Sequence, residues 1–163
     1  CQSLAIRKLP DTIEVIAIMA FSDCNNLVLT TLPRKLQQIQ PAAFARCKSL
    51  VLSDAGAIPD GITVLEFGVF HSCESLALKE LPKGLVSIED SAFKNCTSLA
   101  LTKLPPELER IEKDAFSGCS SLALDYDSIP LPEKLIFVGA GAFDGCTALS
   151  PRTREKLDEI VER

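Results

Sequence analysis

Thiol and imidazole groups are the side chains of this sequence that could do chemistry. Seven cysteines are spread along 163 residues, and His71 is the single histidine. Cysteines can form disulfides, bind a metal or act as nucleophiles, and each role needs a different arrangement. A zinc site needs closely spaced cysteine pairs or several imidazoles, and this sequence has neither. We therefore expect no metal site and no cofactor.

The cysteines are regularly spaced, at intervals of 23, 23, 26, 23, 23 and 27 residues. Each therefore occupies the same position of a repeating unit. Neighbouring turns of a stacked repeat lie about 4.8 Å apart, which would permit a disulfide, but the side chains would point in parallel and the number of cysteines is odd. We favour buried free thiols over disulfides. The residues concerned are Cys1, Cys24, Cys47, Cys73, Cys96, Cys119 and Cys146.

Apolar residues also recur at fixed positions. With each cysteine counted as position 0, leucine fills position 3 throughout, and leucine or isoleucine fills position 5 in the first six units. A Leu-Pro pair follows at positions 8 and 9 in four units, and an aliphatic pair lies near positions 12 and 15. Self-similarity of this kind indicates a repeat array. The units close with Ala20-Phe21, Ala43-Phe44, Val69-Phe70, Ala92-Phe93, Ala115-Phe116 and Ala142-Phe143.

Units of this length with closely spaced leucines are typical of a leucine-rich solenoid, in which every turn adds a short strand to a parallel sheet. We predict an α/β-type solenoid of about six units over residues 1–149, with each strand near positions 3 to 8 and a proline at its end. Because the sequence begins in mid-pattern at Cys1, we expect preceding repeats or a cap. Position 4 would form a flat sheet face suited to another protein, lined by Ala5, Val28, Val51, Ala77, Ala100 and Ala123.

Residues 150–163 leave the repeat and predict a capping helix. Ser150 can cap its N-terminus and Pro151 suits its first position. Leu157, Ile160 and Val161 would share one face. Such a helix would cover the open end of the array, and a partner-binding helix is the alternative.

Two units carry extra residues, around 53–57 and 125–130. Both insertions follow the first apolar segment of their unit, so they should bulge from the same edge of the solenoid. Tolerated loop variation explains them more simply than a recognition loop does.

The charge pattern excludes some partners. The net charge is -5, the isoelectric point is near 4.9, and acids and bases are mixed along the chain. Nucleic-acid binding needs a concentrated basic surface, so we expect no nucleic-acid partner. No run approaches the roughly 18 apolar residues of a membrane span, so we expect no membrane insertion by this segment.

Nothing in the repeat suggests catalysis. A nucleophile, a base and an orienting group are not found together, so we expect no enzyme and no catalytic residue. His71 is interpreted as an exposed turn residue. Asn95 begins an Asn-x-Thr glycosylation pattern, but turn chemistry explains it equally well.

Apolar residues at positions that are otherwise polar are the candidate partner-binding residues. Exposed apolar side chains that stack across units would form a contact surface. Packing at the array's end or against an insertion is the alternative. The candidates are Val15, Ile18, Val64, Phe67, Ile136 and Phe137, with Met19 beside the first pair.

The patterns Cys-x-x-Leu, Leu-Pro, Leu-x-x-Ile and Ala-Phe-x-x-Cys together resemble the BspA-like leucine-rich repeats of bacterial and protist proteins, over residues 1–149. The chain departs from the commonest pattern in having leucine at position 5 instead of 6. The resemblance implies a curved or gently twisted solenoid, and many bacterial members are surface proteins that attach to host proteins. We therefore expect a non-enzymatic scaffold that binds another protein, as a fragment of a surface or secreted protein. An accessory subunit of a larger intracellular or organellar assembly is the alternative.

Overall fold

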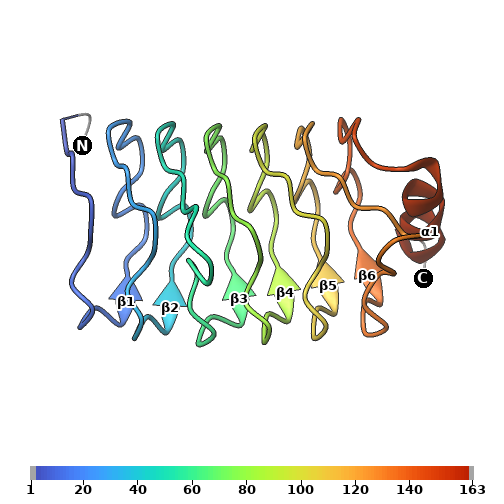
Figure 1. The fold of residues 1–163 in the computed structure, drawn as a ribbon, viewed down its shortest axis with the longest axis horizontal. Helices are drawn as coiled ribbons and strands as arrows, with labels where there is room; N and C mark the ends of the chain where they lie inside the picture. Colours follow the sequence, from blue (N-terminus) through green and yellow to red (C-terminus); the bar gives the residue numbers. More distant parts are fainter. Residues whose placement is uncertain (1–2, 162–163) are drawn as a thin grey trace.

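A computed structural model describes residues 3–161, in which the chain winds into turns stacked along one axis (Figure 1). Each repeat unit contributes one two-residue strand, and a single helix follows the last unit. The predicted leucine-rich solenoid with short parallel strands is confirmed. Its elements are β1 (Val15–Ile16), β2 (Gln38–Ile39), β3 (Val64–Leu65), β4 (Ser87–Ile88), β5 (Arg110–Ile111), β6 (Phe137–Val138) and α1 (Pro151–Val161).

The strands lie elsewhere in the unit than the sequence predicted. They occupy positions 14 and 15 when the inserted residues of the two longer units are left out of the count, not positions 3 to 8. The residues after each cysteine begin with a turn, as in the bond from the Leu27 amide to the Cys24 carbonyl (3.1 Å). Few hydrogen bonds then join neighbouring Leu-Pro segments, because the prolines lack an N–H to donate. The leucines at positions 3, 5 and 8 fill the core from an irregular extended segment.

The predicted flat sheet face at position 4 is therefore wrong. Ala77, Ala100 and Ala123 are exposed, and Val28 and Val51 are half-buried, but none of them lies in a strand. The first residues of five of the six strands, such as Val15, are instead the exposed or half-buried residues of the sheet, and the second residue of each strand is buried; in β4 both residues are buried.

The sheet is interrupted between β2 and β3. Strands β1 and β2 pair in parallel, and β3, β4, β5 and β6 form a second parallel sheet. The units that carry β2 and β3 are hydrogen-bonded again just after these strands. There the Ala42 amide donates to the Phe67 carbonyl (2.8 Å) and the Phe44 amide donates to the Val69 carbonyl (3.0 Å). The stack is thus continuous, but its sheet face opens at this joint.

A column of stacked phenylalanine rings fills the core. Consecutive ring centroids lie 5.2–5.7 Å apart, with interplanar angles of 8–16°. The four central rings are fully buried. Because these rings come from the Ala-Phe pairs, the sequence correctly placed them inside. The column is Phe21, Phe44, Phe70, Phe93, Phe116 and Phe143.

Each phenylalanine lies between two residues with left-handed backbone, at positions 18 and 22 of the unit. Most residue types adopt this conformation at a cost of about 1–2 kcal/mol. The same turn nevertheless recurs with Met19 and Ala42, where φ is 56° in both. Backbone hydrogen bonds to the neighbouring units hold this turn in place. Because the turn does not require glycine, the sequence gives little indication of it.

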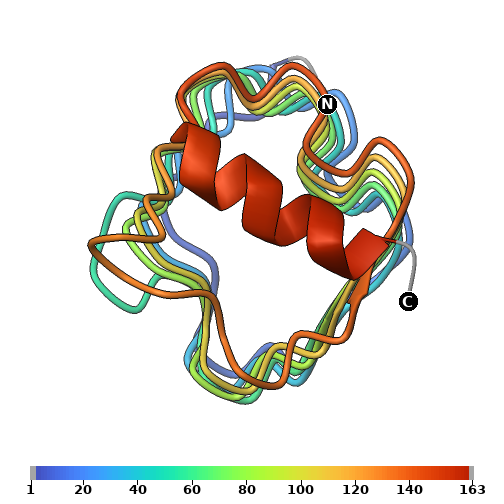
Figure 2. The ribbon, with the colours of Figure 1, turned by 90° about the vertical axis from the view of Figure 1, so that its right-hand side faces the viewer.

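Helix α1 lies across the end of the solenoid (Figure 2). The Thr153 amide donates to the Ser150 hydroxyl (3.2 Å), which confirms the predicted N-cap. The Thr153 hydroxyl donates to the Leu124 carbonyl (3.0 Å) and accepts the Tyr126 amide (2.8 Å), tying the helix to the last unit. Of the predicted apolar face, Leu157 is buried, while Val161 stays exposed.

The two insertions bulge from the same side of the cross-section, as expected (Figure 2). In the first, the Thr30 hydroxyl donates to the carboxylate of Asp54 (3.1 Å), and the Leu32 amide donates to the Ala57 carbonyl (2.8 Å). The loop is therefore anchored to the preceding unit.

Candidate functional site

The six cysteines of the described chain are buried free thiols, as predicted. Cys1 lies outside the described residues. Each thiol from Cys47 onward donates at 2.9–3.1 Å to a phenylalanine carbonyl of the adjacent turn of the stack, as Cys47 does to Phe21. That carbonyl also accepts the amide of the cysteine three residues after it, as Phe44 does from Cys47 (3.2 Å). The position therefore suits cysteine because it needs a small apolar group with one donor.

Burial makes these thiols unreactive. It raises the pKa of Cys47 and Cys119 to about 12 and that of Cys146 to about 11, and it raises the pKa of Cys73 and Cys96 as well. Since the thiolate is the nucleophile, a raised pKa removes the reactive species at neutral pH.

We expect thiol labelling at pH 8 to be slow without denaturant. In a Cys1→Ser variant every remaining thiol lies in the described chain, so a chromogenic disulfide reagent should react fully only after unfolding. Rapid modification of several thiols, or an intact mass showing paired loss of hydrogens, would contradict the buried free thiols.

His71 is half-buried, whereas the sequence predicted an exposed turn residue. Its Nδ1 lies 3.2 Å from the Ser72 hydroxyl. Burial lowers its pKa, and the cations of Arg46 and Lys94 lower it further. The imidazole is therefore largely neutral at pH 7, and no carboxylate of residues 3–161 is hydrogen-bonded to it.

The structure divides the six predicted contact residues into two groups. Val15, Ile18 and Phe67 are exposed by 49, 61 and 57%, and Val64 is half-buried. Met19 is exposed as well, and Pro41 lies between the first and third units. We call this group the N-terminal apolar patch: Val15, Ile18, Met19, Pro41, Val64 and Phe67.

Backbone hydrogen bonds show that this patch is contiguous. The Met19 amide donates to Pro41 (3.1 Å), and the Ala42 amide donates to Phe67 (2.8 Å), so positions 17 and 18 of three successive units lie side by side. Pro41 is also an apolar residue at this otherwise polar position, but the sequence analysis did not select it.

The second group, Ile136 and Phe137, lies at the other end of the sheet. Ile136 is 63% exposed, but the Arg110 guanidinium lies over the ring of Phe137, 4.1 Å from its centroid. Arg110 also pairs with Glu112 (2.8 Å). Units four and five separate the two groups with polar residues at the same positions: Ser87, Asp90, Arg110 and Lys113.

Two hollows adjoin the N-terminal apolar patch. One, of about 360 Å³, lies where the sheet opens and is lined by Gln38, Val64 and Glu66, among others. The other, of about 240 Å³, lies beside Phe67. Its remaining lining residues, none of which the sequence analysis selected as contact residues, are Ala42, Ala45, Arg46, Gly68, His71, Ser91 and Lys94.

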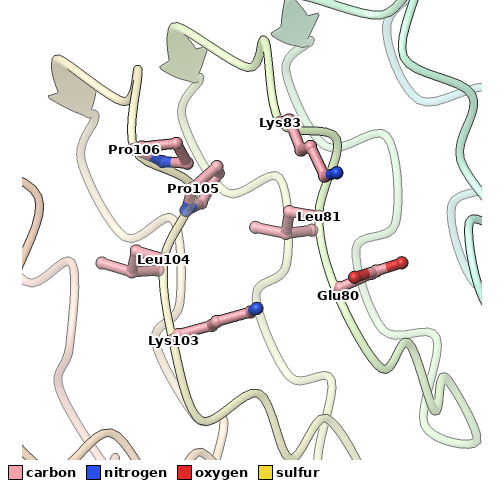
Figure 3. Close-up of a pocket in the computed structure, with 7 residues that line it drawn as sticks. All are labelled: Glu80, Leu81, Lys83, Lys103, Leu104, Pro105 and Pro106. Carbon is pink, nitrogen blue, oxygen red and sulfur yellow. The ribbon is translucent and has the colours of Figure 1, made fainter. Parts of the chain in front are cut away.

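A further hollow of about 230 Å³ lies between the Leu-Pro segments of units four and five (Figure 3). Leu81 points toward the turn that carries Leu104, and Lys103 extends across the gap, whereas Glu80 points away from it. Its walls are completed by prolines and Lys83. This hollow is a gap between successive turns, and its ionisable lining residues are Glu80, Lys83 and Lys103.

Other kinds of site are not indicated by the described chain. No group of histidine, cysteine and carboxylate side chains in residues 3–161 is placed to hold a metal ion. Within the same residues, no helix is both long and apolar enough to span a membrane. The apolar patch and its two hollows are therefore the principal candidate site.

Comparisons with known proteins agree with this architecture. A T. pallidum leucine-rich repeat protein of known structure is 30% identical, with a TM-score of 0.80 over 98% of this chain and 72% of that one. A leucine-rich cell surface protein from Faecalibacterium prausnitzii is 26% identical, with a TM-score of 0.58 over 96% of this chain but only 34% of that one. A Eubacterium ventriosum leucine-rich repeat protein, 17% identical, shares the fold, with a TM-score of 0.61 over 89% of this chain and 44% of that one.

No curated protein sequence matches the chain. A family model for the BspA type leucine-rich repeat region matches residues 1–123 in six copies. Six of the seven cysteines, and every closing pair except Ala142-Phe143, fall within this match. The chain therefore belongs to the BspA-type leucine-rich repeat family.

Proposed function

We propose that this chain is a non-enzymatic scaffold that binds another protein through its N-terminal apolar patch. The observation that carries the proposal is Phe67, a large aromatic side chain that is 57% exposed and lines the hollow of about 240 Å³. Aromatic residues are enriched at the centres of protein interfaces, where a small number of them dominate the binding energy.

The packing of the array supports this role. The stacked phenylalanines and buried cysteines explain the recurring apolar positions as core, but they leave Ile18, Met19 and Phe67 unexplained. A run of exposed apolar residues across adjacent units usually marks a contact surface. Because the patch is built on ladder-bonded turns, its side chains are presented on a rigid support.

We extend the proposal to a surface or secreted location. It is supported by the F. prausnitzii neighbour, which is described as a cell surface protein, although this chain spans about a third of that protein. Ile136 and Phe137 are a second, weaker contact region, because Arg110 already covers one face of the Phe137 ring.

We expect Phe67→Asp to abolish association with the partner while changing stability little. A charge at an exposed site alters the free energy of unfolding by roughly 0.5 kcal/mol or less, whereas loss of a central aromatic contact costs about 2 kcal/mol or more in binding. The measurements are the melting temperature by circular dichroism and recovery of bound proteins from host or source-cell surface fractions, quantified by mass spectrometry.

Lys113→Asp is the matched control, since Lys113 is exposed at the equivalent position two units along. It should bind as the wild type does. A large drop in melting temperature for Phe67→Asp would assign the side chain to the core. Unchanged recovery at unchanged melting temperature would refute the patch as the contact surface.

A further inference from the structure

We propose that the hollow beside Phe67 receives a carboxylate from an acidic, extended segment of the partner protein, whose neighbouring apolar side chain packs against Phe67. This inference rests on the proposed function, because it names the chemistry of the partner at the same surface. It is not a consequence of the overall charge, which is -5 for the whole chain.

The charge of the hollow is the first argument. Three ionisable side chains line it, Arg46, His71 and Lys94, and all three are basic. The carboxylates that pair with this group belong to Asp23, 2.7 Å from Arg46, and Asp114, 3.2 Å from Lys94, and neither lines the hollow. An anion that enters would therefore meet cations and no competing carboxylate.

Arg46 and Lys94 also act on the imidazole of His71, which lines the same hollow. Although Asp23 and Asp114 lie near Arg46 and Lys94, both cations still act to lower the pKa of the imidazole, in addition to burial. A carboxylate placed among the three groups would reverse that effect by favouring the charged imidazole.

The arrangement of the basic groups favours an extended segment. They come from three successive units, since the Arg46 amide donates to the His71 carbonyl (2.7 Å) and the Ser72 amide to the Lys94 carbonyl (2.7 Å). Units spaced about 4.8 Å apart give a row about 10 Å long, which about three residues of an extended chain would cover.

The ligand chemistry follows from what is already occupied. Both Nε and Nη2 of Arg46 donate to the Asp23 carboxylate at 2.7 Å. The Arg46 guanidinium therefore cannot use this pair of N–H groups for the bidentate contact that favours phosphate. Lys94 donates to Asp114 (3.2 Å) but has three N–H groups in all, so together with His71 it can still offer single donors, which suit a carboxylate. Phe67, in the wall of the same hollow, provides the apolar contact.

The test uses the single histidine as a reporter. Imidazole proton and carbon signals of the full chain are followed by NMR during titration with three blocked pentapeptides. The first has four glutamates around a central leucine, the second has lysines in place of the glutamates, and the third has glycine in place of the leucine. The expected result is a shift of the His71 signal and a rise of its pKa with the first peptide, and about tenfold weaker binding of the second.

Variants localise the contact. Lys94→Gln should weaken the acidic leucine peptide about three- to tenfold, while Lys113→Gln, which removes an exposed lysine outside the hollow, should leave it unchanged. Phe67→Ala should reduce the affinity for the acidic leucine peptide to the affinity that the wild type shows for the glycine peptide. The groups that set the His71 pKa in this comparison are Arg46 and Lys94, their partners Asp23 and Asp114, and the bound carboxylates.

Equal binding of the lysine and glutamate peptides, or no response of His71 to the acidic peptide, would overturn the inference. Equal losses for Lys94→Gln and Lys113→Gln would also overturn it, because binding would then be nonspecific. If the peptides fail but Phe67→Asp still abolishes partner recovery, only the acidic segment is refuted. If Phe67→Asp leaves recovery of the partner protein unchanged, the proposed contact surface itself is refuted.

Discussion

Replacing Phe93 with alanine is expected to lower the free energy of unfolding by about 3–5 kcal/mol. The ring is fully buried and stacks between Phe70 and Phe116, with centroids 5.6 and 5.2 Å away. The substitution removes apolar burial, leaves a cavity and breaks two aromatic contacts at once. Neighbouring turns cannot close over the gap, because ladder bonds such as Phe93 amide to Ala115 carbonyl (2.8 Å) fix their spacing.

Phe67→Ala is the matched control, because it removes the same side chain from an exposed position. Urea denaturation followed by circular dichroism should show a clear fall in midpoint for Phe93→Ala and a change of roughly 0.5 kcal/mol or less for Phe67→Ala. In a repeat array, stability is a sum of units and interfaces, so the loss should weaken both neighbouring units. A loss below about 1 kcal/mol would mean that the ring column is not part of the core.

The core could be predicted from the sequence because it repeats. Cys96, Leu99 and Phe116 recur in register with the same types in other units, and a side chain that never varies in polarity across units must share one environment. The thiol bonds to the phenylalanine carbonyls were not predictable, since they depend on how one unit is stacked on the next.

Strand position was wrong for a related reason. Leucines two residues apart, such as Leu99 and Leu101, show the period of a strand, but they lie in an irregular extended segment that makes few ladder bonds. The true strand β5 is two residues long, too short to show any period. Backbone pairing, not side-chain pattern, decides where such a strand forms.

The candidate site could be predicted only in part from the sequence. Phe67 and Ile18 stood out as apolar residues at polar positions, but their adjacency through Pro41 follows from hydrogen bonds between units. The basic hollow was missed because Arg46 and Lys94 come from different positions of their units and gather only after stacking. Local sequence therefore identified the anchor but not its surroundings.

Gly139→Ala is expected to destabilise the chain at the upper end of the roughly 1–3 kcal/mol typical of overpacking. A Cβ at Gly139 would lie 2.5 Å from the Lys113 nitrogen and 2.7 Å from the Glu112 carbonyl carbon, both backbone atoms. Relief requires β6 to move away from β5, yet the Gly139 amide donates to the Ile111 carbonyl at 2.7 Å. Since α1 packs against β6, the displacement should also loosen the contacts that bury Leu157.

Gly84→Ala provides the matched control, since a Cβ there would meet only the Asp60 carbonyl oxygen at 3.8 Å, an ordinary contact. Neither glycine has a positive φ, so the two substitutions differ in space and not in backbone strain. Gly84→Ala should leave the urea midpoint unchanged or raise it slightly, because alanine restricts the unfolded chain. Hydrogen exchange should then show faster exchange of the α1 amides in Gly139→Ala alone. Equal midpoints for the two variants would mean that β5 and β6 can separate freely, and the tight spacing at the C-terminal end of the array would be refuted.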